Sequence, residues 1–213
     1  MSRIPPSTVA DVGSTAWIAA EVDRIASLPR SVLARTRGIH PDRAPVLAGG
    51  AIALVGLASV LVSPAALRTM PESLVSEDKR DRTYYVFLYA FWSILLAVPL
   101  AGNLAAAWLL VEATTATSAI LVGFSGKPRA LEAAWKYLIL TSLGLGVALL
   151  GIVLLAAGVP GGGLDGLTWG ELSDYEGGRD TALAAYLLLL AGLAAKIGWA
   201  PVHNWLPDAH SEA

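Results

Sequence analysis

The sequence has no cysteine among its 213 residues. Disulfide bonds, thiolate metal sites and cysteine-ligated iron–sulfur clusters are therefore excluded, and no redox centre is visible. Charged residues are also scarce, at 15%, against about a quarter in soluble domains. The net charge of −2 gives no basis for nucleic-acid binding or for an acidic substrate. We expect a chain that binds neither nucleic acid nor a metal or other cofactor.

Apolar residues, by contrast, make up 55% of the chain and form long runs between clusters of charge. This pattern predicts an all-α integral membrane protein, because a bilayer core of about 30 Å is crossed by a helix of roughly 20 apolar residues. The sequence predicts about five transmembrane helices within a membrane domain over residues 46–213. The expected spans are residues 46–67, 84–101, 104–124, 137–158 and 181–202. Residues 1–45 form a polar N-terminal extension with a weak amphipathic pattern for a surface helix over residues 15–28.

Three ionisable residues lie in or at the edge of these spans: Glu112, Lys136 and Lys196. A charge at the middle of a bilayer costs about 2.5–3.5 kcal/mol on insertion scales, so such a residue usually faces a partner or a water-filled cavity. Glu112 is too short to reach the interface, and Thr115 follows one turn later on the same helix face. Lys136 has an alternative interpretation, because it could extend to the interface or pair with Glu132 four residues earlier.

The last predicted span is interrupted at Pro201, which lacks an amide donor and clashes with the preceding helical turn. A broken helix beside a buried lysine such as Lys196 is typical of transport sites. His203, Asp208 and His210 follow the break, and histidine can exchange protons near neutral pH. A structural hydrogen-bonding role for His203 and an ordinary loop role for His210 remain open, and this spacing is a poor signal for a metal site.

Three segments together resemble a known family: "LLVEATTATSAILVGF", "ALEAAWKYLILTSLG" and "KIGWAPVHNWLPDAHSEA". They are similar to the antiporter-like membrane subunits of respiratory complex I and of hydrogenase-4 and formate hydrogenlyase complexes, and more distantly to Mrp-type antiporters. The resemblance covers residues 46–213. It implies that Glu112 and Lys196 form a charge pair that gates proton movement and that Lys136 tunes this pair. It also implies that His203 and Asp208 pass charge along the membrane plane.

Family members contain two inverted helix repeats, and the resemblance reaches only the N-terminal part of them. The sequence leaves open whether a separate chain supplies the second repeat, whether the gene is truncated, or whether the chain is a fragment. The partners implied are the lipid bilayer and other membrane subunits of a respiratory or hydrogenase complex. The localisation implied is a multi-pass position in the plasma (inner) membrane.

Three functions are compatible with these features. The first is a proton-translocating subunit, or its N-terminal part, of a complex-I-like oxidoreductase or a membrane-bound hydrogenase. Such a subunit is not catalytic alone, because the sequence has no nucleophile motif, metal cluster or nucleotide loop. The second is a structural membrane scaffold of such a complex that transports nothing, and the third is a stand-alone cation/proton antiporter component.

Overall fold

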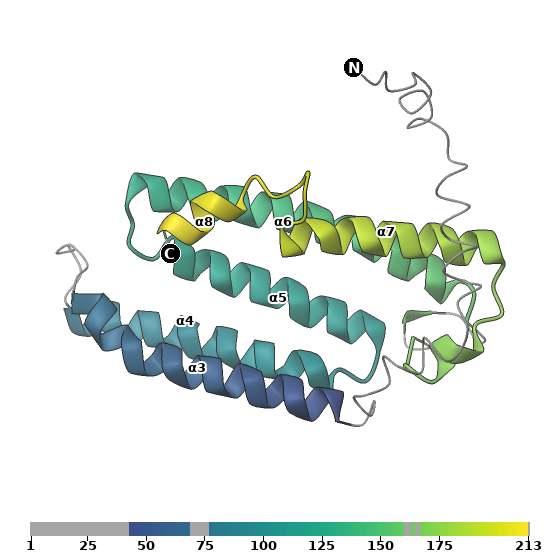
Figure 1. Ribbon diagram of the computed structural model, residues 1–213, viewed down its shortest axis with the longest axis horizontal. Coiled ribbons are helices and arrows are strands. Elements are labelled where there is room, and N and C mark those ends of the chain that lie inside the picture. Colours follow the sequence, from purple (N-terminus) through teal and green to yellow (C-terminus); the bar gives the residue numbers. More distant parts are fainter. Residues whose placement is uncertain (1–42, 69–76, 160–162, 165–166, 213) are drawn as a thin grey trace, which may run out of the picture. The chain divides into compact units, whose positions relative to one another are not determined.

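The computed structural model describes residues 43–68, 77–159, 163–164 and 167–212. The helices described here belong to the unit Pro45–Ala213, with the first of them beginning one residue before it. The surface helix expected over residues 15–28 lies outside the described residues. In chain order the helices are α3 (Ala44–Arg68), α4 (Glu77–Ala97), η2 (Val98–Leu100), α5 (Leu104–Val122), α6 (Pro128–Ala156), η4 (Glu171–Asp174), α7 (Arg179–Ile197) and α8 (Leu206–Glu212) (Figure 1).

Five of these helices are long and apolar enough to cross a membrane: α3, α4 with η2, α5, α6 and α7. The predicted fold class, an all-α membrane chain with about five spanning helices, is therefore confirmed. The helices exceed the apolar runs, since α4 begins at Glu77 and α6 at Pro128, ahead of the runs that start at Tyr84 and Tyr137. Helical hydrogen bonding continues through polar turns outside the apolar region, and a proline is favourable in a first turn because its missing N–H is not needed there.

Consecutive helices pack side by side, with α5 between α4 and α6, and α7 against α6 (Figure 1). The indole of Trp92 on α4 donates to the carbonyl oxygen of Ile52 on α3 at 3.2 Å. Asn103 caps the start of α5, because its side chain accepts a hydrogen bond from the amide of Ala106 at 2.7 Å. The first contact joins α4 to α3, and the second fixes the start of α5, the helix that carries Glu112.

The contact between α6 and α7 is made by small residues. Gly144 and Gly151 on α6 are buried against α7. A Cβ on Gly144 would lie 2.9 Å from the carbonyl oxygen of Gly192, and a Cβ on Gly151 would lie 2.6 Å from that of Ala185. Small residues let two backbones approach closely, as is usual between helices in membranes. This close contact brings the end of α7, with Lys196, against the middle of α6.

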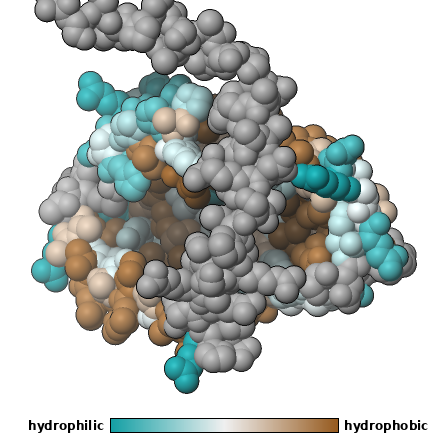
Figure 2. Space-filling model, turned by 45° about the vertical axis from the view of Figure 1, so that its right-hand side comes forward, coloured by the Kyte–Doolittle hydropathy of each residue, from teal (hydrophilic) through white to brown (hydrophobic). Residues whose placement is uncertain are grey.

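Large apolar side chains on the outer faces of the helices are widely exposed. Leu54 on α3 is 71% exposed and Leu143 on α6 is 67% exposed. Figure 2 shows such apolar side chains open on the face in view. Exposed apolar surface of this extent is unfavourable in water, and a lipid bilayer covers it.

The interruption after α7 begins three residues earlier than Pro201. The helix ends at Ile197, and Gly198 adopts a left-handed conformation with φ of 73°, which glycine reaches without the steric cost that a Cβ brings. The indole of Trp205 then donates to the carbonyl oxygen of Ala195 at 2.9 Å and satisfies one end of the broken helix. Pro201 lies inside the irregular segment, and α8 continues along α6 in the same direction as α7, toward the start of α6 (Figure 1).

Candidate functional site

Lys196 lies in the last turn of α7 and is half-buried. Its Nζ donates hydrogen bonds to Thr115 Oγ1 on α5 and to Tyr137 Oη on α6, both at 2.7 Å. Nζ also lies 5.0 Å from the centre of the Tyr137 ring. The ammonium group is therefore held by acceptors from two neighbouring helices.

The hydroxyl of Tyr137 continues this network toward Ser118 on α5, with an Oη–Oγ distance of 2.8 Å. Ser118 Oγ donates in turn to the carbonyl oxygen of Thr114 at 2.6 Å. An ammonium has donors only, so Tyr137 Oη accepts from Lys196 and its own hydrogen points to Ser118. The donors run in one direction, from the lysine to a backbone carbonyl.

Glu112 lies on α5 one turn before Thr115. Its Oε1 accepts a hydrogen bond from Ser142 Oγ on α6 at 2.6 Å. Its Oε2 is buried and has no partner among the described residues. Within the described part of the chain no ion pair joins Glu112 to Lys196. Glu112 and Lys196, which were expected to pair, are each held by hydroxyl groups instead.

Lys136 lies on α6 next to Tyr137 but points away from this site. Its Nζ is 2.7 Å from Glu132 Oε1 and 3.0 Å from Asp208 Oδ2 on α8. The i,i+4 pair with Glu132, which was the alternative interpretation of Lys136, is present, and Asp208 adds a contact between helices. The Lys136 side chain is 47% exposed, so both ion pairs are accessible to water.

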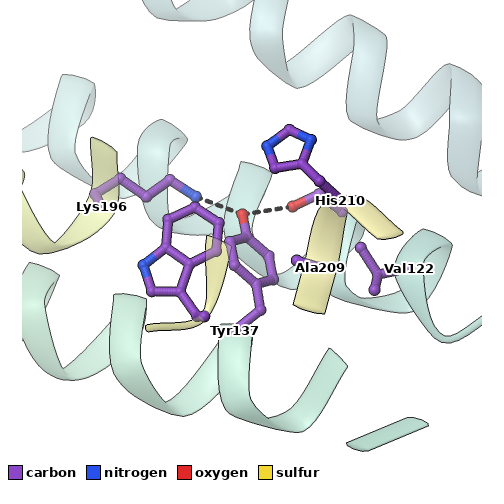
Figure 3. Close-up of a pocket in the computed structure, with 7 residues that line it drawn as sticks. Val122, Tyr137, Lys196, Ala209 and His210 are labelled. Carbon is purple, nitrogen blue, oxygen red and sulfur yellow. Dashed lines mark hydrogen bonds between the residues drawn. The ribbon is translucent and has the colours of Figure 1, made fainter. Parts of the chain in front are cut away.

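A pocket of about 260 Å³ opens beside Lys196. Tyr137, Lys196 and His210 converge on it from α6, α7 and α8 (Figure 3). His210 is exposed at the pocket edge, whereas His203 is exposed in the segment before α8. A second pocket of about 310 Å³ surrounds Lys136, Glu132 and Asp208. Within the described ranges, no group of three or more histidine, aspartate or glutamate side chains gathers closely enough to hold a metal ion.

The structure adds two site residues that the sequence reasoning missed, Tyr137 and Ser142. Both are polar groups in the largely apolar stretch of α6, which was the available signal. Their partners, Lys196 and Glu112, are 59 and 30 residues away along the chain, so only helix packing brings them together.

The sequence profile of one family, described as NADH:quinone oxidoreductase/Mrp antiporter, transmembrane, matches residues 101–213. This is 113 of 213 residues and includes α5 to α8 with all the residues of the site. The chain belongs to this family. Together with the five apolar helices, membership of this transmembrane family makes the chain a multi-pass membrane protein.

Individual relatives of this antiporter-family chain carry related names. It is 34% identical over 116 residues to a hydrogenase-4 component F homolog of Methylacidiphilum infernorum, covering 52% of this chain and 24% of the relative. It is 29% identical over 191 residues to NADH-quinone oxidoreductase subunit N of Deinococcus radiodurans, covering 87% of this chain and 36% of the relative. It is also 31% identical over 173 residues to NAD(P)H-quinone oxidoreductase chain 4 of Microcystis aeruginosa, covering 76% of this chain and 30% of the relative. The chain thus spans about a quarter to a third of the length of these relatives.

Proposed function

We propose that this chain is a proton-translocating, antiporter-like membrane subunit, or the N-terminal part of one, in a complex-I-like or hydrogenase-type assembly. Its family and the names of its relatives support this class of complex. The proposal places the chain in the plasma (inner) membrane beside other membrane subunits. One of these, or the rest of the same polypeptide, supplies the second helix repeat.

One observation carries the proposal: Lys196, Glu112 and their hydroxyl partners form a polar site between three apolar helices. Lys196 reaches Thr115, which is one turn from Glu112 on α5. A half-buried ammonium and a half-buried carboxylate attract each other only while both are charged, so neutralising either one removes the attraction. Proton transfer at either group therefore changes the arrangement of the pair, which is the property a gate requires.

We assign supporting roles to the groups beyond this pair. Lys136 joins α6 to α8 through Asp208, so we propose that it tunes the field at Lys196 from the neighbouring face of α6. For His203 and Asp208 we propose the role that the family resemblance implies, passing charge along the membrane plane, with His210 at the pocket edge as a supporting residue.

The test uses Lys196→Ala in the intact membrane assembly, with Lys79→Ala as the matched control, since Lys79 is exposed at the polar start of α4. Proton uptake and electron-transfer turnover are measured in the same inverted membrane vesicles. We expect Lys196→Ala to assemble normally and to lower proton uptake by more than about tenfold, since a positioned proton-transfer group typically contributes about 10²–10⁴-fold. Uptake at the level of Lys79→Ala would contradict the proposal and favour a scaffold.

A second candidate function is a cation/proton antiporter component, because the family description includes Mrp antiporters. It predicts Na⁺- or K⁺-dependent acidification in vesicles that hold no hydrogenase or dehydrogenase. The same vesicles, assayed with and without each cation, separate this function from redox-driven pumping.

A further inference from the structure

In this structure Glu112 and Lys196 each hydrogen-bond to hydroxyl groups, and among the described residues no ion pair joins them. We propose that Thr115, Tyr137 and Ser142 are positioning residues that compete with the Glu112–Lys196 ion pair and so set how often the two charges meet. The physiological meaning of this inference rests on the proposed function, but its structural content concerns only which partners the two charged groups choose.

On the lysine side, the two hydroxyls are arranged as acceptors. Thr115 is fully buried, and its Oγ1 donates to the carbonyl oxygen of Val111 at 3.2 Å. Because its single hydrogen is used there, its lone pairs are left for Lys196. Tyr137 is likewise an acceptor, since its hydrogen is directed to Ser118. Both groups therefore hold the Lys196 side chain in a position without a hydrogen bond or ion pair to Glu112.

The donor chain from Lys196 does not act as an outlet for protons. It ends where Ser118 donates to the carbonyl oxygen of Thr114, and an amide carbonyl in a helix does not take a proton onward. A proton could move along this chain only if every hydroxyl group in it reversed the direction of its hydrogen bond. The chain therefore holds the ammonium in place, which is a positioning role.

On the carboxylate side, Ser142 donates to Oε1 of Glu112 and fixes the direction of the group. Oε2 is buried without a partner among the described residues, and a buried acceptor of this kind favours contact with a donor. Ser142 thus stabilises Glu112 without Lys196 and leaves one oxygen to receive the lysine.

The two alternative partners of Lys196, Thr115 and Glu112, lie close together along α5. Thr115 and Glu112 are three residues apart on α5, a rise of about 4.5 Å along the helix. A lysine side chain has four rotatable carbon–carbon bonds, so rotamer changes alone can move Nζ by this distance. We therefore infer that a change of Lys196 rotamer is the movement that exchanges Thr115 for Glu112.

The test measures the direct contact by zero-length cross-linking of the full-length protein in its native membrane. A membrane-permeable carbodiimide, dicyclohexylcarbodiimide, activates a carboxyl group, and a lysine in contact with it forms an amide that mass spectrometry identifies. The Lys136–Asp208 contact at 3.0 Å is the internal standard, because the site variants leave it unchanged when the fold is intact.

We expect a low Glu112–Lys196 yield in the wild type and an increase of about threefold or more in Thr115→Val, Tyr137→Phe and Ser142→Ala. Thr115→Ser keeps the hydroxyl and should return the yield to the wild-type level. An unchanged or reduced Glu112–Lys196 yield, with Lys136–Asp208 cross-linking intact, would overturn the inference. The cross-linking assay involves no transport, so it is independent of the proton-uptake test. If the Glu112–Lys196 yield rises in the hydroxyl variants while Lys196→Ala shows normal proton uptake, the proposed function is refuted and the positioning role is retained.

Discussion

At the scale of single residues, the balance between two arrangements of Lys196 is a matter of comparable energies. A unit-charge pair at 4 Å and an effective dielectric constant of 20 is worth about 4 kcal/mol. Hydrogen bonds to a charged group contribute about 1.5–3 kcal/mol each, and Lys196 makes two of them, to Thr115 and Tyr137. Neither arrangement dominates by a wide margin, so the loss or gain of one proton is enough to change which is preferred.

Ser142→Ala tests the strength of the contact on the carboxylate side. The serine hydroxyl lies 2.6 Å from Glu112 Oε1, and its removal leaves both carboxylate oxygens without a partner among the described residues. We expect the free energy of unfolding to fall by about 1.5–3 kcal/mol, measured by denaturant titration in mixed micelles.

Two controls make this prediction specific. Ser142→Thr keeps a hydroxyl at the same position and should lose less stability than Ser142→Ala. In a Glu112→Gln background the cost of Ser142→Ala should shrink to about 0.5–1.5 kcal/mol, because the acceptor is then neutral. Equal costs in the two backgrounds would show that Ser142 does not act through the charge of Glu112.

At the scale of helices, glycine placement on α6 decides how closely α7 approaches. The sequence correctly predicted about five spanning helices, because apolar length is enough to indicate them. It did not predict which glycines face a neighbour: Gly144 meets α7, whereas a Cβ on Gly146 would have nothing within 4 Å. That distinction depends on how α6 is rotated against α7, which composition alone does not specify.

The pair Gly144→Ala and Gly146→Ala tests this account. A methyl group at Gly144 would contact the Ala195 side chain and the Gly192 carbonyl, and overpacking of this kind costs about 1–3 kcal/mol. At Gly146 the same change meets open space and should be neutral or stabilising by up to about 1 kcal/mol, because alanine is the better helix former. Thermal unfolding of the two variants in detergent gives both values, and equal stability of the two would contradict the packing described for α6 and α7.

At the scale of the whole chain, the sequence pointed to the charged side chains and to two of their partners, Thr115 and Glu132, but not to Tyr137 and Ser142. Glu112, Lys136 and Lys196 stand out because a charge within an apolar run is costly. Tyr137 and Ser142 carry no such mark, since hydroxyl groups are common in membrane helices. The interruption of the last span was expected at Pro201, but it begins at Gly198, because a glycine in the left-handed conformation ends the helix before the proline is reached.

The Lys136–Asp208 contact shows how the parts of the site are joined across the chain. It links α6 to α8 on the face of α6 next to the Lys196 site. Family membership over residues 101–213 covers this whole arrangement. The Lys196 site and the Lys136 site are therefore neighbouring parts of one described helical unit.

The central claim is that a carboxylate able to carry charge at residue 112 is needed for proton movement. The most direct measurement compares proton uptake per electron transferred in Glu112→Gln and Glu112→Asp, both in the intact assembly in inverted vesicles. Glutamine keeps the shape and loses the charge, whereas aspartate keeps the charge and loses one methylene group. We predict that Glu112→Gln loses at least about tenfold of the uptake while Glu112→Asp retains most of it. Equal uptake in the two variants, at the wild-type level, would contradict the account.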